Sequence, residues 1–198
     1  MTLTRLDSAR YRRTPWKNGG GVTVDIAGAS VPGVAPGAWE GMIWRFGQTR
    51  IERPGPFSDL SGFDRLLAVV DGQGLVLHPV GAPALDVRAR FHPVRFPGEW
   101  QIESELEDGP VTVVNLMADR RRAAIDLRFA AGSTPLAFAP GTLVLYAVAG
   151  ASTVGLSGGD SIELAPAEAV QVESDGPIAV TLRSGVVATA SIRPLSPR

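Results

Sequence analysis

Short runs of branched apolar residues, separated by glycine and proline along the whole chain, most restrict how this sequence can fold. The 198 residues include 23 Gly and 16 Pro, which mark turns at short intervals. Val111–Met117 and Ile178–Leu182 have the length and β-branched content of strands. Further runs of this kind are Val22–Ile26, Leu66–Val70, Leu75–Leu77, Leu143–Val148 and Ala169–Val172. No segment shows a convincing amphipathic helix of three turns, so the pattern predicts an all-β sandwich or barrel.

The two halves of the chain repeat the same landmarks in the same order. The matched pairs are Leu67–Gly72 with Leu145–Gly150, Pro97–Glu99 with Pro166–Glu168, and Asp108–Pro110 with Asp175–Pro177. Strands separated by a Gly turn, a Pro-x-Glu turn and a Gly-Pro turn form the pattern of a cupin barrel, which is a double-stranded β-helix. Generic β-strand punctuation could match by chance, but three ordered landmarks favour duplication. We therefore predict a bicupin with tandem halves at 1–122 and 123–198.

Composition excludes several classes of protein. With 44% hydrophobic and 20% charged residues, the chain can bury a core rather than remain disordered. Nineteen basic and twenty acidic residues leave a net charge of -1, which does not favour a nucleic-acid partner. The absence of cysteine removes disulfides and thiolate sites. No signal peptide and no apolar stretch of about 20 residues is found, so we expect a cytoplasmic protein without membrane partners.

The two histidines do not form a metal motif. A cupin usually binds its metal through a His-x-His pair, since residues i and i+2 of a strand face the same side. His78 and His92 lie far apart in the sequence, each directly before a proline, and the second half has no histidine. We therefore expect neither a bound metal nor a cofactor.

The most unusual local sequence is Trp16-Lys-Asn-Gly-Gly-Gly21. Consecutive glycines expose backbone N–H groups and allow the main chain to wrap closely around a ligand. Lys17 adds a positive charge, and the Asn18 amide both donates and accepts hydrogen bonds. A flexible turn before the Val22–Ile26 strand is the alternative interpretation. On the ligand-binding hypothesis, Lys17, Asn18, Gly19 and Gly20 are candidate contacts.

A second group of candidates surrounds Arg45, which interrupts the apolar stretch Met42–Phe46. The guanidinium group matches a ligand carboxylate bidentately, but an internal salt bridge to Asp64 or Glu99 would explain Arg45 equally well. Asp64 and Arg65 come directly before the first repeated strand, where Arg65 could point into the barrel mouth or into solvent.

Asn115 is a polar residue within the apolar run Val113–Met117. A buried Asn needs hydrogen-bond partners. Its side chain is therefore bound either to the backbone or to a ligand.

At this point the motifs resemble those of the HutD/Ves family. The motifs that carry the resemblance, in family order, are Pro15–Gly21, Trp44-Arg45, Gly55–Ser58, Gly62–Arg65, Phe96–Glu99 and Asn115–Met117. The resemblance covers essentially the whole chain, although the second half matches in pattern more than in motif. Two positions depart from the family, which tends to have Ser where Gly47 stands and Ala where Thr49 stands.

The resemblance implies a bicupin linked to bacterial histidine utilisation, with no firmly associated catalytic activity. We expect a metal-free accessory or regulatory protein that binds a small carboxylate such as urocanate or formylglutamate. Arg45, with Lys17 or Arg65, would hold the carboxylate, while Asn18 and the glycine backbone bind its polar remainder. The aromatic cover would come from Trp44 or Phe57, and the remaining candidate contacts are Asp64, His92 and Asn115.

Two other functions stay open on the sequence. A hydrolase or isomerase of a small acid could use the same pocket with His92 or Glu99 as general base, although no nucleophile–base pair stands out. An interaction protein could use the glycine-rich segment to bind a partner. Double cupins often bury strand edges by pairing, so a homodimer is also an expectation. The second half, which lacks a comparable polar cluster, is expected to be a structural copy.

Overall fold

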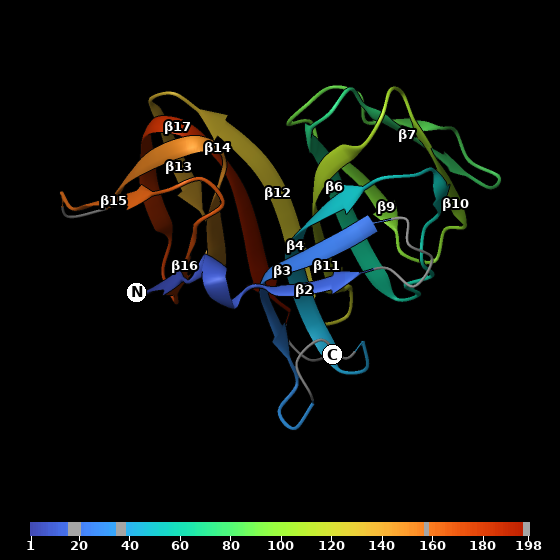
Figure 1. Ribbon diagram of the computed structural model, residues 1–198. Helices are drawn as coiled ribbons and strands as arrows, with labels where there is room; N and C mark the ends of the chain where they lie inside the picture. The colour runs from blue at the N-terminus through green and yellow to red at the C-terminus, as the bar shows by residue number, and fades with distance from the viewer. Residues whose placement is uncertain (16–20, 35–38, 157–158, 196–198) are drawn as a thin grey trace. The chain divides into compact units, whose positions relative to one another are not determined.

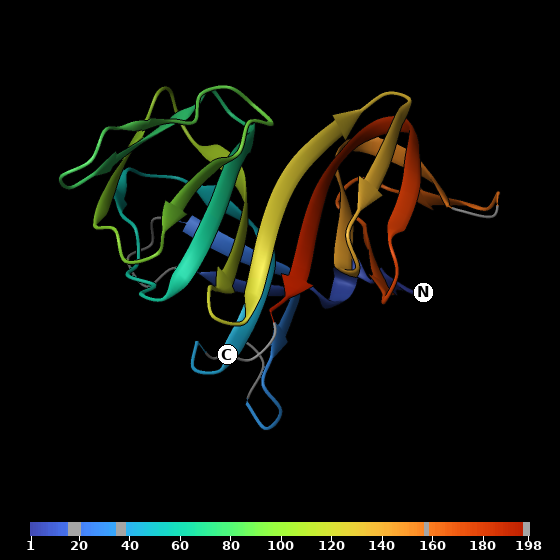
Figure 2. The same ribbon diagram turned by 180° about the vertical axis from the view of Figure 1, so that it is seen from behind.

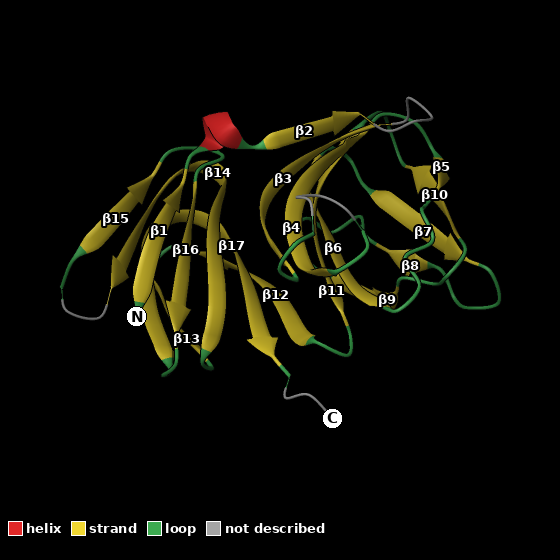
Figure 3. Ribbon diagram, turned by 90° about the horizontal axis from the view of Figure 1, so that it is seen from below, coloured by secondary structure: helices red, strands yellow, loops and turns green. Residues whose placement is uncertain are grey.

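The computed structural model describes residues 1–15, 21–34, 39–156 and 159–195, and most of these residues belong to β-strands. Among these described residues the one helical element is a single 3-10 turn, η1 (Ser8–Arg10), which Figure 3 shows in red. The predicted all-β class is therefore confirmed. No helix in the described part of the chain has the length and apolar character needed to cross a membrane.

The chain divides into two compact units. The two-sheet unit consists of Arg12–Ala123 together with Leu195, and the one-sheet unit consists of Met1–Tyr11 and Ala124–Pro194. The first residues group with the later part of the chain because β1 (Thr2–Leu6) pairs antiparallel with β16 (Ala169–Ser174).

The two-sheet unit is built from one six-stranded and one four-stranded antiparallel sheet (Figure 1). The six-stranded sheet runs in the order β2 (Arg12–Pro15), β3 (Gly21–Ser30), β4 (Met42–Ile51), β11 (Val111–Asp119), β6 (Phe63–Asp71) and β9 (Val94–Pro97). The four-stranded sheet runs in the order β5 (Gly55–Pro56), β10 (Ile102–Leu106), β7 (Leu75–Pro79) and β8 (Leu85–Asp86). Buried residues from both sheets form one core cluster that includes Leu67, Leu77, Phe96, Ile102 and Val113.

The one-sheet unit joins its strands into a single seven-stranded sheet. Its main path is β1, β16, β14 (Gly141–Leu156), β17 (Ile178–Pro194) and β12 (Ala123–Ala131), with β13 (Thr134–Phe138) paired to β17 and β15 (Ser161–Leu164) paired to β14. The long curved ribbons of β12 and β17 lie side by side in Figure 2, in yellow and red. Buried side chains such as Leu143, Leu145, Val172 and Leu182 form its core.

The predicted strand positions are confirmed, but the two closed barrels are not found. Each apolar run singled out in the sequence lies within a strand, namely β3, β6, β7, β11, β14, β16 or β17. No sheet formed by the described residues closes into a barrel. In the first copy the chain turns after Asp71 and separates into β6 and β7, whereas in the second copy β14 continues through Gly150. That unbroken strand pairs with β15, β16 and β17, which unites the second copy in one sheet.

Candidate functional site

A cavity of about 640 Å³ lies within the two-sheet unit. Its volume falls in the range of small-molecule sites. Alternate residues of β4, β6 and β11 line it, because successive side chains of a strand point to opposite faces of the sheet. The segment between β5 and β6 completes the wall with Phe57, Ser58 and Leu60.

Arg65 is a buried cation in this wall and lacks an acidic partner among the described residues. The residue is 6% exposed, and its guanidinium carbon lies 5.1 Å from the Phe57 ring centroid and 5.0 Å from that of Phe96. Its Nε finds no hydrogen-bond acceptor in the described part of the chain, and Nη1 makes only a long 3.5 Å contact to the Ser58 carbonyl. Burial lowers the Arg65 pKa to about 10, so the side chain is still protonated at neutral pH.

Asn115 presents a second unsatisfied atom to the same cavity. Arg65 faces Met117 across the β6–β11 pair, and Asn115 lies two residues further along β11 on the same face. Such diagonal neighbours lie about 7–8 Å apart. The Asn115 Oδ1 is buried and accepts no hydrogen bond from the described residues. A buried donor and a buried acceptor that find no partner among residues 1–15, 21–34, 39–156 and 159–195 therefore occur in one polar corner of the cavity, where a ligand would satisfy both.

Arg45 lines the cavity too, but its carboxylate partner differs from those expected. It forms an ion pair with Asp25 rather than with Asp64 or Glu99. The same carboxylate accepts a hydrogen bond from Arg12 Nε at 3.0 Å, through its other oxygen. The Arg45 guanidinium also stacks 5.2 Å from the ring centroid of Trp39.

Asp25 was missed by the sequence reasoning, although it organises this side of the cavity. It stands opposite Arg12 in the β2–β3 pair and opposite Gly47 in the β3–β4 pair. A single acid between Val24 and Ile26 in a predicted strand was the available signal, because a half-buried charge in a strand needs a cross-strand partner.

Gly47 and Thr49, the two positions expected to depart from the family pattern, both line the cavity. Thr49 is 3% exposed and shares a 3.1 Å hydroxyl–hydroxyl hydrogen bond with Thr23. Gly47 lies where the β3 backbone approaches closely, since a Cβ built there would lie 2.7 Å from the Val24 carbonyl oxygen. The glycine is thus explained by backbone packing, and Thr49 by its hydroxyl partner.

Four of the candidate residues from the sequence come together in the cavity, namely Arg45, Phe57, Arg65 and Asn115. Trp44 does not line it, because it occupies the opposite face of β4 and is buried there. His92 is exposed, with Nδ1 2.9 Å from the Arg90 carbonyl oxygen. Lys17, Asn18, Gly19 and Gly20 lie outside the described residues.

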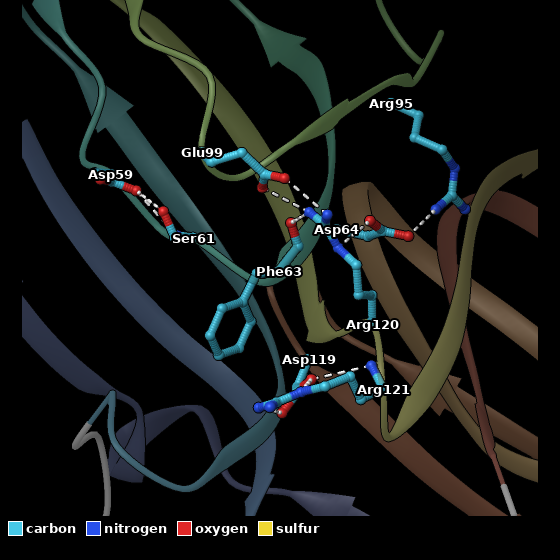
Figure 4. Close-up of polar contacts among 9 residues, drawn as sticks. All are labelled: Asp59, Ser61, Phe63, Asp64, Arg95, Glu99, Asp119, Arg120 and Arg121. Carbon is cyan, nitrogen blue, oxygen red and sulfur yellow. Dashed lines mark hydrogen bonds and ion pairs between the residues drawn. The ribbon is translucent and has the colours of Figure 1, made fainter. Parts of the chain in front are cut away.

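Asp64 and Glu99 belong to a separate ion-pair network outside the cavity lining (Figure 4). Arg120 donates to Glu99 at 2.7 and 2.6 Å and lies 3.2 Å from Asp64, which also pairs with Arg95 at 3.4 Å. The hydrogen bond from Arg120 holds the pKa of Glu99 below its usual value. A carboxylate held ionised in this way is a weak proton acceptor at neutral pH. Neither proposed general base, His92 or Glu99, lines the cavity.

The described residues contain no cluster of three or more His, Asp or Glu side chains arranged to hold a metal ion. His78 instead lies 2.9 Å from the Glu105 carboxylate. The chemistry available in the cavity is therefore that of guanidinium, amide and hydroxyl groups beside aromatic rings.

Comparisons of the sequence and of the structure with known proteins point to the same family. The HutD family model matches residues 8–189. An "uncharacterized 21.2 kDa protein in hutC 3'region" of Pseudomonas putida is 30% identical over 173 residues, covering 87% of this chain and 88% of that protein. The solved structure of HutD from Pseudomonas fluorescens SBW25 is 26% identical, with a TM-score of 0.84 over 98% of this chain and 100% of that one.

A second solved structure, a conserved protein of unknown function from Pseudomonas aeruginosa PAO1, is also 26% identical. It has a TM-score of 0.86 and covers 97% of this chain and 99% of that one. More distant structural neighbours are cupin-like, and at 10% identity or less they show the fold alone.

Proposed function

Because this chain belongs to the HutD family, we propose that it binds a small carboxylate of histidine catabolism and acts as an accessory or regulatory protein of that pathway. The family name and the position of the Pseudomonas putida relative beside hutC support the pathway. The ligands to consider are the pathway intermediates urocanate and formylglutamate. Their site would be the cavity of the two-sheet unit.

The observation that carries this proposal is the buried guanidinium of Arg65, which pairs with no acidic side chain of the described residues. Burying a charge without a partner costs several kcal/mol, so proteins usually pair or hydrogen-bond such groups. No carboxylate among the described residues pairs with Arg65, while a ligand-sized cavity opens beside it. A ligand carboxylate would supply the missing acceptor bidentately, beside the Phe57 ring, which lines the cavity next to Arg65.

The remaining cavity residues favour a ligand with a second polar group. Asn115 Oδ1 needs a hydrogen-bond donor, which the imidazole N–H of urocanate or the amide N–H of formylglutamate can provide. Each charge-assisted contact contributes about 1.5–3 kcal/mol. Two such contacts with modest apolar burial correspond to a Kd of roughly micromolar.

Calorimetric titration of the full chain with urocanate, formylglutamate, histidine and glutamate tests the proposal. We expect roughly micromolar binding of urocanate or formylglutamate and weaker binding of the two free amino acids, because their ammonium groups would be repelled by the arginines of the cavity. Absence of heat with all four compounds at millimolar concentration would contradict the proposed function.

A further inference from the structure

Asp25 holds two arginines at one side of the cavity with a single carboxylate. Arg45 donates to one of its oxygens, and Arg12 donates to the other through Nε at 3.0 Å. The Asp25 and Arg45 side chains are only 17% and 14% exposed, so solvent screens their charges weakly. The Arg12 side chain is 45% exposed. Counted by themselves, two guanidinium groups and one carboxylate carry a net charge of +1, and we call these three residues the Asp25 triad.

The fold aims Asp25 at both arginines. A β-bulge between Asp25 and Ala27 shifts the register of β3 against β4, and bulges of this kind re-aim a side chain. The facing residue of β4 is Gly47, which has no side chain to separate the Asp25 carboxylate from Arg45. Arg12 stands directly opposite Asp25 on β2. Residues of the three neighbouring strands β2, β3 and β4 thus fix the position of the Asp25 carboxylate.

The two arginines of the Asp25 triad line the same cavity as Arg65, with Asp25 paired behind them. Arg45 and Arg65 both stand opposite Met117, one on each side of β11, so they occupy one row of the sheet. Neighbouring strands are about 4.8 Å apart, which places the two Cα atoms roughly 10 Å from each other. A ligand with acidic groups at both ends could contact both arginines. A monocarboxylate held by Arg65 would have no second negative charge to interact with the triad.

We propose that Asp25 is the specificity-determining residue of the cavity, because it cancels one of the two guanidinium charges that a second ligand carboxylate would meet. This inference rests on the proposed function. With Asp25 present, the triad carries one net positive charge and gives a dianionic ligand a limited advantage over a monoanionic one. Without its negative charge, the triad carries two, and the advantage of the dianion increases.

The test compares N-formylglutamate with N-formylglutamine, which have nearly the same shape and differ by one carboxylate charge. The quantity measured is the Kd of N-formylglutamine divided by the Kd of N-formylglutamate. Both constants are determined for the full-length protein by calorimetry, at low and at physiological salt. Asp25→Asn, which preserves the size of the side chain, is expected to raise the preference for N-formylglutamate by about tenfold, and less at the higher salt concentration. The ratio cancels any general loss of affinity caused by a loosened Arg45.

Arg12→Gln provides the reciprocal control. Combined with Asp25→Asn, it removes the extra positive charge and should return the ratio to about the wild-type value. A purely structural role of Asp25 predicts no such compensation, since Arg45 would lack its carboxylate partner in the double variant as well. Thermal unfolding of each variant establishes that it is folded under the conditions of the titration.

The outcomes separate the two proposals. An unchanged or lower ratio in Asp25→Asn, with both compounds still bound, overturns the role of Asp25 and leaves the proposed function intact. Binding of urocanate with no binding of N-formylglutamate to any variant also overturns it, because a triad with two net charges must attract a dianion. If no carboxylate binds to the wild-type protein, the proposed function fails and this inference fails with it.

Discussion

Replacement of Arg65 with Met is expected to weaken carboxylate binding by about 100-fold or more while leaving the protein at least as stable as the wild type. The affinity falls because the guanidinium supplies the charge and the donors that the ligand carboxylate would contact. The stability does not fall, because the described residues offer Arg65 no carboxylate and its Nε no acceptor. Methionine has a similar length and can pack beside the Phe57 and Phe96 rings, where a thioether makes favourable contacts.

Calorimetry and urea unfolding of the same preparations measure the two effects. We expect an unfolding free energy equal to that of the wild type or higher by about 1–3 kcal/mol, as when a buried charge is replaced by an apolar side chain. Arg95→Met is the matched control, since Arg95 pairs with Asp64 and does not line the cavity. Its affinity should remain at the wild-type value. Unchanged affinity in Arg65→Met would show that the carboxylate does not bind at Arg65 in this cavity.

Replacement of Phe96 with Ala is expected to lower the free energy of unfolding of the two-sheet unit by about 3–5 kcal/mol. Phe96 is 1% exposed and belongs to the core cluster that both sheets share. Its ring also contacts Arg65 and lies 6.3 Å from that of Phe57, centroid to centroid. The truncation leaves a cavity in the core and removes one face of the aromatic enclosure around the guanidinium.

Tryptophan fluorescence during urea unfolding can follow this change, because all four Trp residues belong to the segment of the two-sheet unit. Phe96→Leu is the control, since it retains most of the volume and should lose only about 1 kcal/mol. A loss below about 1 kcal/mol for Phe96→Ala would show that the two sheets do not depend on this ring for their packing.

Strand positions could be predicted from the sequence because they follow from local residue preference. Val111–Met117, for example, is rich in β-branched residues and becomes part of β11, the strand between β4 and β6. Sheet closure could not be predicted in the same way, since it depends on pairing between distant segments. The sequence around Gly150 resembles that around Gly72, yet only the first copy separates there into two strands.

The candidate site, too, could be predicted only in part from the sequence. Arg45 was recognised because a charged residue in an apolar strand needs a partner, and Arg65 because it comes directly before an apolar strand, where it could point into the barrel mouth. Trp44 and Asp64 are their immediate neighbours, and strand alternation alone forbids that both members of each pair face the cavity. Asp25 was harder to find, because its partners lie on the neighbouring strands β2 and β4 and the bulge in β3 alters the register that would identify them.

NMR of the Arg65 guanidinium during ligand titration tests most directly whether this group is the anion-binding centre of the protein. The Nε–Hε resonance can be assigned by its absence in Arg65→Met. If a ligand carboxylate fills the missing hydrogen bond, the Hε signal should move downfield on addition of urocanate or formylglutamate and saturate at the calorimetric midpoint. An Arg65 signal that stays in place while the protein becomes saturated with ligand would contradict the account.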